Sequence, residues 1–294
     1  METTTQQEIP EVSEPVASVK KIEDPEPERG IGDPDKTKDP ELDRETSMAA
    51  DKTEREAIMR EMLEAGVQYG RAKRFTQSAM QEFLVKLNKS VEIFDIEKTL
   101  DYLNRLTEFI RQALQEEKKI LFVGTQPAAQ EAIEKIATAL DQPYLNAKWI
   151  GGFLTNFSTI KVRMKFYLEL KQKQAEGEIN SYPMHEKQRM LRELQKMNTI
   201  YRGVAQMESL PALIFTVNLN YKPHRTMVRE AKRKNIPIIG IGGSDNDPHL
   251  FEVFVPANDK APRSIAWLTD YVIATIKSTE TEMVEPNKVE ELNG

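Results

Sequence analysis

Short apolar runs alternate with amphipathic stretches along the middle of the chain. Runs rich in β-branched and aromatic residues, each a strand candidate, occur at 91–96, 120–123, 144–145, 212–217, 236–241 and 253–255. Helical spacing of apolar residues is found at about 97–116, 127–140, 224–234 and 264–277. Strands that alternate with helices form βαβ units, and runs that are apolar on both faces belong in a covered sheet. The pattern therefore predicts an open, doubly wound α/β domain with a parallel sheet.

Another amphipathic helix is predicted before the first strand candidate, beginning at about residue 53. Ile58, Met62 and Ala65 fall on one face of this helix, and Gly66 provides a C-terminal stop. This helix belongs to the α/β domain because its apolar face needs a core to pack against.

The segment 158–204 interrupts the alternation because it contains no strand pattern. Its first half has a seam with steps of four and three residues at Ile160, Met164, Tyr167, Lys171 and Gln174. The same spacing returns, after a turn with Gly, Asn and Pro, at Met190, Leu194, Met197, Tyr201 and Val204. This predicts an antiparallel coiled-coil hairpin inserted into the α/β domain. The polar seam near its tip predicts weak packing there and a hairpin that stands clear of the core.

Charge is distributed unevenly and divides the chain further. Residues 1–50 hold fourteen acidic against six basic residues, and residues 279–294 hold five against one. Both ends offer little apolar surface to offset the entropy of ordering, so 1–52 and 279–294 are expected to be disordered. The α/β domain is then expected to comprise 53–157 and 205–278, with the hairpin at 158–204.

Composition excludes several classes of protein. The chain has no cysteine, so it has no disulfides and no thiolate zinc site. No apolar run approaches the ~20 residues of a membrane span, and the acidic, Pro-rich start is unlike a signal or transit peptide. A cytoplasmic protein without a membrane partner is expected.

The turn at Gly124-Thr125 has two interpretations. Free backbone N–H groups at a helix N-terminus would suit a phosphate. Alternatively, Thr125 caps the following helix and Pro127 lies in its first turn. The second interpretation is favoured because neither a dinucleotide-binding nor a P-loop glycine pattern is present.

The loop after the 236–241 strand, G-I-G-G-S-D-N-D-P, has similar alternatives. Gly242-Gly243 could contact a nucleotide, or Asp245, Asp247 and Pro248 could form a turn that caps the next helix, which we favour. A metal site at Asp245, Asp247 and His249 has weak support because no further histidine is near. No nucleophile motif or thiol is present, so no catalytic function, cofactor, metal or small-molecule substrate is expected.

The hairpin has the clearest functional signal, since 158–202 holds ten basic and five acidic residues. A protruding rod of positive charge is suited to nucleic-acid phosphates, although a solvated coiled-coil surface would also be basic in part. The predicted RNA contacts are Lys161, Arg163, Lys165, Lys171, Lys173, Arg189, Arg192, Lys196 and Arg202, with Lys187 beside them. A smaller second patch consists of Arg71, Lys73 and Arg74.

Several blocks, taken together, resemble the ribosomal protein S2 family in its bacterial form. In order they read E-M-L-E-A-G-V-Q-Y-G, I-L-F-V-G-T, N-A-K-W-I-G-G-F-L-T-N, L-P-A-L-I-F-T-V-N, D-N-D-P and P-A-N-D-K-A-P-R-S-I, over about 55–277. The resemblance implies a flavodoxin-like α/β domain with an inserted coiled-coil hairpin and no enzymatic activity. It also implies binding to small-subunit (16S-type) rRNA late in assembly, near the head–body junction. The implied protein partners are neighbouring small-subunit proteins, including the large mRNA-binding ribosomal protein one.

The chain departs from the family pattern in three places. Gln68 and Arg71 stand where the family commonly has histidines, so no contact of those histidines is carried over. The stretch after Arg74 lacks the usual Asn-Pro, which puts the rRNA contact near 71–85 in doubt, and the acidic extension is long.

The W-I-G-G-F-L-T-N block is interpreted as an anchor for the hairpin. Trp149 is expected to pack with Phe153, and Gly151 and Gly152 are expected to allow a tight turn or close approach. Thr155 or Asn156 would cap the first hairpin helix, and Lys148 and Lys161 would contact RNA at the two ends of the block. Two rival functions are a nucleotide- or phosphate-binding enzyme using the loops at Gly124 and Gly242, and a protein-binding scaffold acting through the hairpin.

Overall fold

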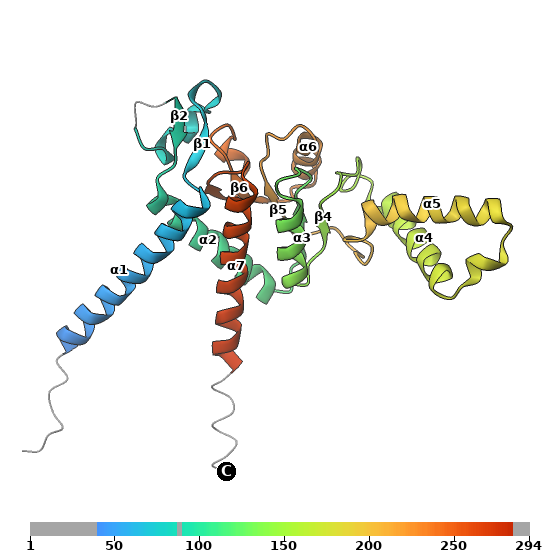
Figure 1. Ribbon diagram of the computed structural model, residues 1–294, viewed down its shortest axis with the longest axis horizontal. Coiled ribbons are helices and arrows are strands. Elements are labelled where there is room, and N and C mark those ends of the chain that lie inside the picture. Colours follow the sequence, from blue (N-terminus) through green and yellow to red (C-terminus); the bar gives the residue numbers. More distant parts are fainter. Residues whose placement is uncertain (1–39, 87–89, 285–294) are drawn as a thin grey trace, which may run out of the picture. The chain divides into compact units, whose positions relative to one another are not determined.

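A five-stranded parallel sheet forms the centre of the domain in the computed structural model, which describes residues 40–86 and 90–284 and the side chains of 52–86 and 90–279 (Figure 1). The strand order is β4-β3-β5-β6-β7. The strands are β3 (Ile120–Val123), β4 (Tyr144–Leu145), β5 (Leu213–Val217), β6 (Ile238–Gly242) and β7 (Val253–Pro256). β3 lies beside both β4 and β5, so that Phe122 pairs with Tyr144 on one side and Phe215 on the other. The predicted doubly wound α/β class is confirmed.

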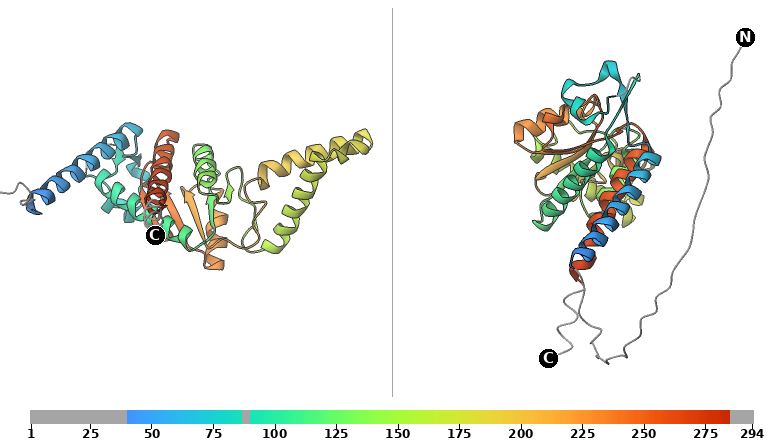
Figure 2. Two further views of the ribbon diagram at one scale, coloured as in Figure 1. Left: turned by 90° about the horizontal axis from the view of Figure 1, so that it is seen from below. Right: turned by 90° about the vertical axis from the view of Figure 1, so that its left-hand side faces the viewer.

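Alternate residues of the strands enter two separate cores. Ile120 and Phe122 of β3 belong to the core under α2 (Ile96–Gln115), α3 (Gln130–Ala139) and α7 (Pro262–Val284), whereas Leu121 and Val123 belong to the opposite one. The opposite core also contains apolar residues of α6 (His224–Lys234) and of the 3-10 helix η2 (Ser78–Phe83). Figure 2 shows α6 and α7 on opposite sides of the strands. Strands apolar on both faces are therefore explained by helices on both sides of the sheet.

The predicted strand at 91–96 is shorter and lies outside the parallel sheet. β2 (Val91–Ile93) pairs antiparallel with β1 (Tyr69–Ala72), and the two form a separate two-stranded sheet. β2 is too exposed for a strand of the central sheet, since Val91 is exposed and the other two residues are only partly buried. Two-stranded pairs of this kind need support from neighbouring elements. The short 3-10 helix η1 (Lys73–Phe75) follows β1.

The helices at the two ends of the domain are longer than predicted. α1 (Pro40–Ala65) ends where Gly66 adopts φ +76°, as predicted, but it begins inside the segment 1–52 that was expected to be disordered. A proline is well tolerated at a first helical position, which is consistent with a start at residue 40. α7 continues to Val284, past the expected boundary at 278. The remainder of both acidic ends lies outside the described residues.

The 158–204 segment contains two helices, α4 (Phe157–Ala175) and α5 (Met184–Tyr201), joined through the 3-10 helix η3 (Glu178–Ser181). They contact each other and lie beyond the edge strand β4 (Figures 1 and 2). The seam differs from the prediction at the distal end, where Leu170 is buried and Lys171 and Gln174 are exposed. After Tyr167 the seam continues three residues later at Leu170, and not four residues later at Lys171, so it stays apolar. Ile179, between the two helices, is buried at its distal end. Coiled-coil packing in the strict sense stays a prediction.

Candidate nucleic-acid interface

The root of the hairpin is held by a buried carboxylate on α6. Glu230 is 6% exposed, and its Oε1 accepts hydrogen bonds from the backbone N–H of Gly152 at 2.9 Å and from Trp149 Nε1 at 3.2 Å. Its Oε2 accepts from the backbone N–H of Leu154 at 3.0 Å. A charged acceptor satisfies three otherwise orphaned donors of one loop, which fixes the loop against α6.

The aromatic prediction for this loop is confirmed. Trp149 is 5% exposed and meets Phe153 edge-on, with ring centroids 5.6 Å apart. The two glycines differ from each other. Gly152 adopts a φ of +84°, which favours glycine in the predicted turn. Gly151 lies in the same turn, but a Cβ at Gly151 would have no atom within 4 Å, so no close approach requires glycine there.

The cap of α4 differs in part from the prediction. Asn156 occupies the N-cap position, but its side chain accepts from the Thr159 hydroxyl at 2.8 Å and makes no bond to the helix backbone. Thr155 instead points its hydroxyl to Glu230, 3.5 Å from Oε2. Both residues therefore help to organise the loop without the capping bond that was expected.

Two cations that were predicted to contact RNA bind acceptors of the protein itself at the hairpin root. Lys161 donates from Nζ to the Glu208 carbonyl oxygen at 2.8 Å. Arg202 forms an ion pair with Glu134, whose other oxygen accepts from Tyr144 OH at 3.0 Å. These contacts tie the start of α4 and the end of α5 to the body of the domain.

The remaining cations of the hairpin point away from its seam. Arg163, Lys165 and Lys171 on α4 are exposed, and Lys173 is partly exposed. On α5, Arg189, Arg192 and Lys196 follow at spacings of three and four and line one shallow depression together with Glu193. Within the described residues none of these seven cations forms an ion pair. They are therefore available for anionic partners, as is the exposed Lys148 in the anchoring loop.

The second predicted patch is held differently. Arg71 forms an ion pair with Asp245 at 2.5 Å, and its guanidinium carbon lies 5.1 Å from the centre of the half-exposed Phe75 ring. Arg74 approaches the same ring at 4.7 Å, and Lys73 is exposed. The patch combines cations with an exposed aromatic ring, which is a common feature of surfaces that contact unpaired bases.

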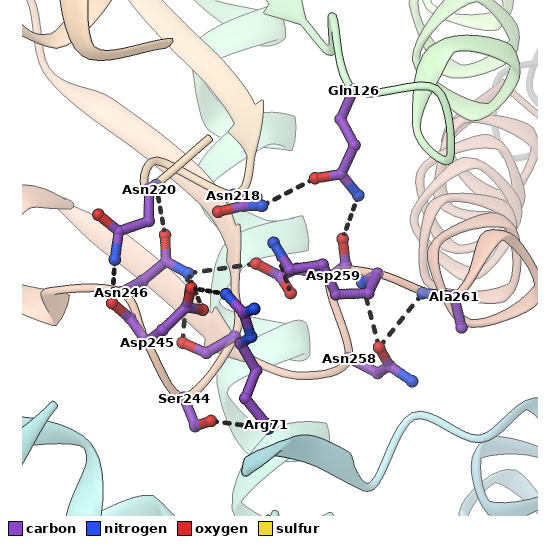
Figure 3. A network of polar contacts seen from close by, with 12 residues as sticks. Arg71, Gln126, Asn218, Asn220, Ser244, Asp245, Asn246, Asn258, Asp259 and Ala261 are labelled. Carbon is purple, nitrogen blue, oxygen red and sulfur yellow. Dashed lines mark hydrogen bonds and ion pairs between the residues drawn. The ribbon is translucent and has the colours of Figure 1, made fainter. Parts of the chain in front are cut away.

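Polar residues gather at the carboxyl ends of the strands, where the rival enzyme function would need its site (Figure 3). Gln126 donates to the Asp259 carbonyl oxygen at 2.6 Å and accepts from Asn218 Nδ2 at 2.7 Å. Asn246 donates to the Asp259 carboxylate at 3.2 Å. The Arg71 backbone N–H donates to Ser244 Oγ at 2.9 Å. These residues hydrogen-bond to one another and thereby join the strand ends to the β1–β2 unit.

His224 takes part in the same cluster and has a structural role. Its Nε2 accepts from the Thr125 backbone N–H at 3.2 Å, and its Nδ1 lies 2.8 Å from the Asn218 carbonyl oxygen. The ring must therefore carry its proton on Nδ1, and burial lowers the pKa of His224 to about 4. Thr125 does not cap α3 as predicted, because the helix begins only at Gln130 with Ala129 at the N-cap position.

The glycines of the two loops are required by packing. A Cβ at Gly124 would lie 2.3 Å from Ile133 Cγ1, and a Cβ at Gly243 would lie 2.5 Å from an Asp259 carboxylate oxygen. A Cβ at Gly242 would lie 2.9 Å from the Phe254 ring. Packing against these neighbours accounts for the glycines without a bound phosphate, so the geometry gives the enzyme alternative no support.

Asp259 is the most deeply buried carboxylate of this cluster. It is 1% exposed, and burial raises its pKa to about 6, although Lys260 Nζ lies 3.8 Å away. Asp247 caps η4 (Pro248–Leu250) by accepting from the His249 backbone N–H at 3.0 Å, so the predicted turn is confirmed. Among the residues that the structure describes, no group of three or more histidine and carboxylate side chains is arranged to hold a metal.

The sequence pattern did not predict the roles of Glu230, of the buried His224 or of the buried Asp259. The only signal for Glu230 was a single acid within a strongly basic stretch, R-E-A-K-R-K. In the described parts of the chain, no helix is both long and apolar enough to cross a membrane.

Comparison with known proteins gives one consistent family. The family described as Ribosomal protein S2 matches residues 62–279. A small ribosomal subunit protein uS2 from Coprothermobacter proteolyticus is 38% identical over 218 residues, which cover 74% of this chain and 81% of the relative. Proteins of the same name from Dictyoglomus thermophilum and Salinispora arenicola are 35% and 36% identical, cover 74% of this chain, and are themselves covered over 88% and 78%.

Proposed function

The chain belongs to the ribosomal protein S2 family, and we propose that it acts as a structural protein of the small ribosomal subunit, bound to small-subunit rRNA. The family match spans 62–279 and therefore includes both the α/β domain and the hairpin. Its place is the cytoplasmic ribosome, and its neighbours are rRNA and other ribosomal proteins. The family is one of structural proteins and not of enzymes.

The observation that carries the RNA-binding proposal is the row of cations on α5 that form no ion pair with another described residue. Arg189, Arg192 and Lys196 lie on one face and share a depression in which only Glu193 opposes them. Cations that are not held in ion pairs can neutralise phosphates and release the counterions condensed on the nucleic acid, which makes binding favourable and dependent on salt. We assign the first contacts to this face and to the exposed cations of α4, with Lys148 at the root.

The test is binding of the full chain to small-subunit rRNA at several salt concentrations. Neutralising Arg189, Arg192 and Lys196 with Gln should lower the magnitude of the salt slope by about 2 and weaken binding about tenfold or more. A matched control neutralises the exposed cations Arg60, Arg105 and Arg263 on α1, α2 and α7. Equal effects of the two variants would contradict the assignment to the hairpin.

The finer division of labour is also a proposal. The α/β body, 53–157 and 205–278, would position the hairpin, and the hairpin, 158–204, would hold rRNA near the head–body junction. The large mRNA-binding ribosomal protein one would then dock beside it. If subunits that lack this chain retain ribosomal protein one at normal levels, this last part is wrong.

A further inference from the structure

A second strongly basic surface lies on α6, outside the residues predicted to bind RNA. Residues 222–234 contain six basic residues and one acidic residue. The acid is Glu230, which is buried and bonded to the hairpin root, so it does not neutralise the outer face of the helix. The exposed residues of this surface, called the α6 face below, are Lys222, Arg225, Arg229, Lys232, Arg233 and Lys234.

The cations of the α6 face have no carboxylate partners. None of the six forms an ion pair with another described residue. Arg229 donates only from Nε to the Arg225 carbonyl oxygen at 3.3 Å, which leaves the end of its guanidinium free. Arg225, Arg229 and Lys232 follow at spacings of four and three and so lie on one side of the helix. Such a row is repulsive in the free protein, because like charges at this spacing destabilise a helix.

Helix stability explains only the C-terminal half of this distribution. Lys232, Arg233 and Lys234 lie in the last turn of α6, where cations interact favourably with the helix dipole. Arg225 lies in the first turn, which has no acidic residue, and Lys222 precedes it. At that end the dipole disfavours positive charge. The cations at the start of α6 therefore have a cost in the isolated protein that an anionic partner would remove.

The α6 face is connected to the hairpin root. Glu230 is the neighbour of Arg229 in the sequence and holds the loop that carries Trp149 and Gly152. The exposed Lys148 belongs to the same loop. Cations of α6 and of the root are thus fixed to one rigid support, on the side of the sheet opposite α7 (Figure 2).

We propose that the α6 face is a second contact for the rRNA phosphate backbone, continuous through Lys148 with the contact made by the hairpin. This inference rests on the proposed function and extends it, because the protein then binds rRNA through two surfaces, the hairpin and the α6 face. Binding at two fixed positions restricts the orientation of the domain on the RNA, which phosphate contacts in a single row do not achieve.

The first test compares three full-length variants in small-subunit rRNA binding. Changing Arg225, Arg229 and Lys232 together to Gln should reduce the salt slope by about 2 and weaken binding about tenfold, as the α5 variant does. The control variant at Arg60, Arg105 and Arg263 should change binding by less than about threefold. The α6 variant should unfold at about the same urea concentration as the unmodified chain, because removal of the unfavourable Arg225 in the first turn offsets removal of the favourable Lys232 in the last turn.

The second test uses the absence of cysteine. A single Arg229→Cys substitution creates one thiol, to which an iron chelate that generates hydroxyl radicals can be attached. Bound to small-subunit rRNA, this protein should cleave the RNA at defined positions, and the same probe at Arg105→Cys should not.

Binding and cleavage separate this inference from the function on which it rests. If the α6 variant binds like the control, and a probe at Arg192→Cys cleaves while one at Arg229→Cys does not, the α6 contact is refuted and the hairpin contact stands. If the unmodified chain shows no preference for small-subunit rRNA over bulk RNA, the proposed function itself fails. Cleavage from position 229 with a normal salt slope would also overturn the proposal, since it would place RNA near α6 without a phosphate contact.

Discussion

Glu230→Gln should loosen the hairpin root without removing an apolar contact. The substitution keeps the size of the side chain but leaves one acceptor oxygen where the carboxylate has two. If the amide oxygen remains near Gly152 and Trp149, the NH2 group faces the Leu154 backbone N–H, now 3.0 Å from a carboxylate oxygen. A donor then opposes a donor in a site that is 6% exposed.

The expected cost follows from these contacts. Hydrogen bonds to a charged group contribute about 1.5–3 kcal/mol each, and an unsatisfied buried donor costs about 1–3 kcal/mol. One bond is lost and the others are weakened by loss of charge, so the free energy of unfolding should fall by about 3 kcal/mol. Glu252→Gln changes an exposed residue whose side chain forms no hydrogen bond with another described residue, so it should change the free energy of unfolding by less than about 0.5 kcal/mol.

Urea unfolding of the full chain measures the change in stability, and fluorescence locates it. In a Trp267→Phe background, Trp149 is the remaining tryptophan, and its emission should shift to the red in Glu230→Gln because the ring leaves its 5% exposed site. A loss below about 0.5 kcal/mol, or unchanged emission from Trp149, would refute the role of Glu230 as the anchor.

Three further predictions concern single positions. Gly152→Ala should cost about 1 kcal/mol in urea unfolding because of its φ of +84°, whereas Gly151→Ala should be neutral or slightly stabilising; equal losses would contradict the account of the loop. Leu170→Ala should lower the free energy of unfolding by about 2–5 kcal/mol and Lys171→Ala by less than about 0.5 kcal/mol, because Leu170 and not Lys171 lies in the hairpin seam. A larger loss for Lys171→Ala would instead support the seam predicted from the sequence. Folded Asp259, with its pKa of about 6 against 3.8, keeps a proton that the unfolded chain releases, so stability falls as pH rises from about 4 to 6. Asp259→Asn removes this loss, and its stability relative to the unmodified chain should rise by up to about 3 kcal/mol across that window; a constant difference would refute it. The opposite pH dependence from His224 is present in both proteins and cancels.

The parallel sheet could be predicted because each strand is an apolar run with helices on both faces. The runs at 120–123 and 253–255 coincide with β3 and β7 to within one residue. The strand at 91–96 was placed in the wrong sheet because its partner, Tyr69–Ala72, has no apolar alternation that could reveal it. Pairing between strands of this kind depends on tertiary contacts, such as the Arg71 ion pair with Asp245, that local pattern does not encode.

The candidate site was predictable in its charge and not in its geometry. Basic residues on the hairpin could be counted, but spacing alone did not show that Lys161 and Arg202 bind protein acceptors. The root loop was recognised from Trp149 and its glycines, yet its anchor, Glu230, comes from a helix about eighty residues later in the chain. The α6 face was not predicted, although residues 222–234 hold six basic residues and one acidic residue in a much shorter segment than 158–202, because the sequence pattern does not show that Glu230 is buried.

The central claim is that this chain is a structural component of the small ribosomal subunit. Its most direct test is sedimentation of a cell lysate through a sucrose gradient, followed by detection of the chain in each fraction. We expect the chain to travel with small subunits and to be released as salt is raised, with release at lower salt for the variant neutralised at Arg189, Arg192 and Lys196. A chain that remains at the top of the gradient at low salt, away from small subunits, would contradict the account.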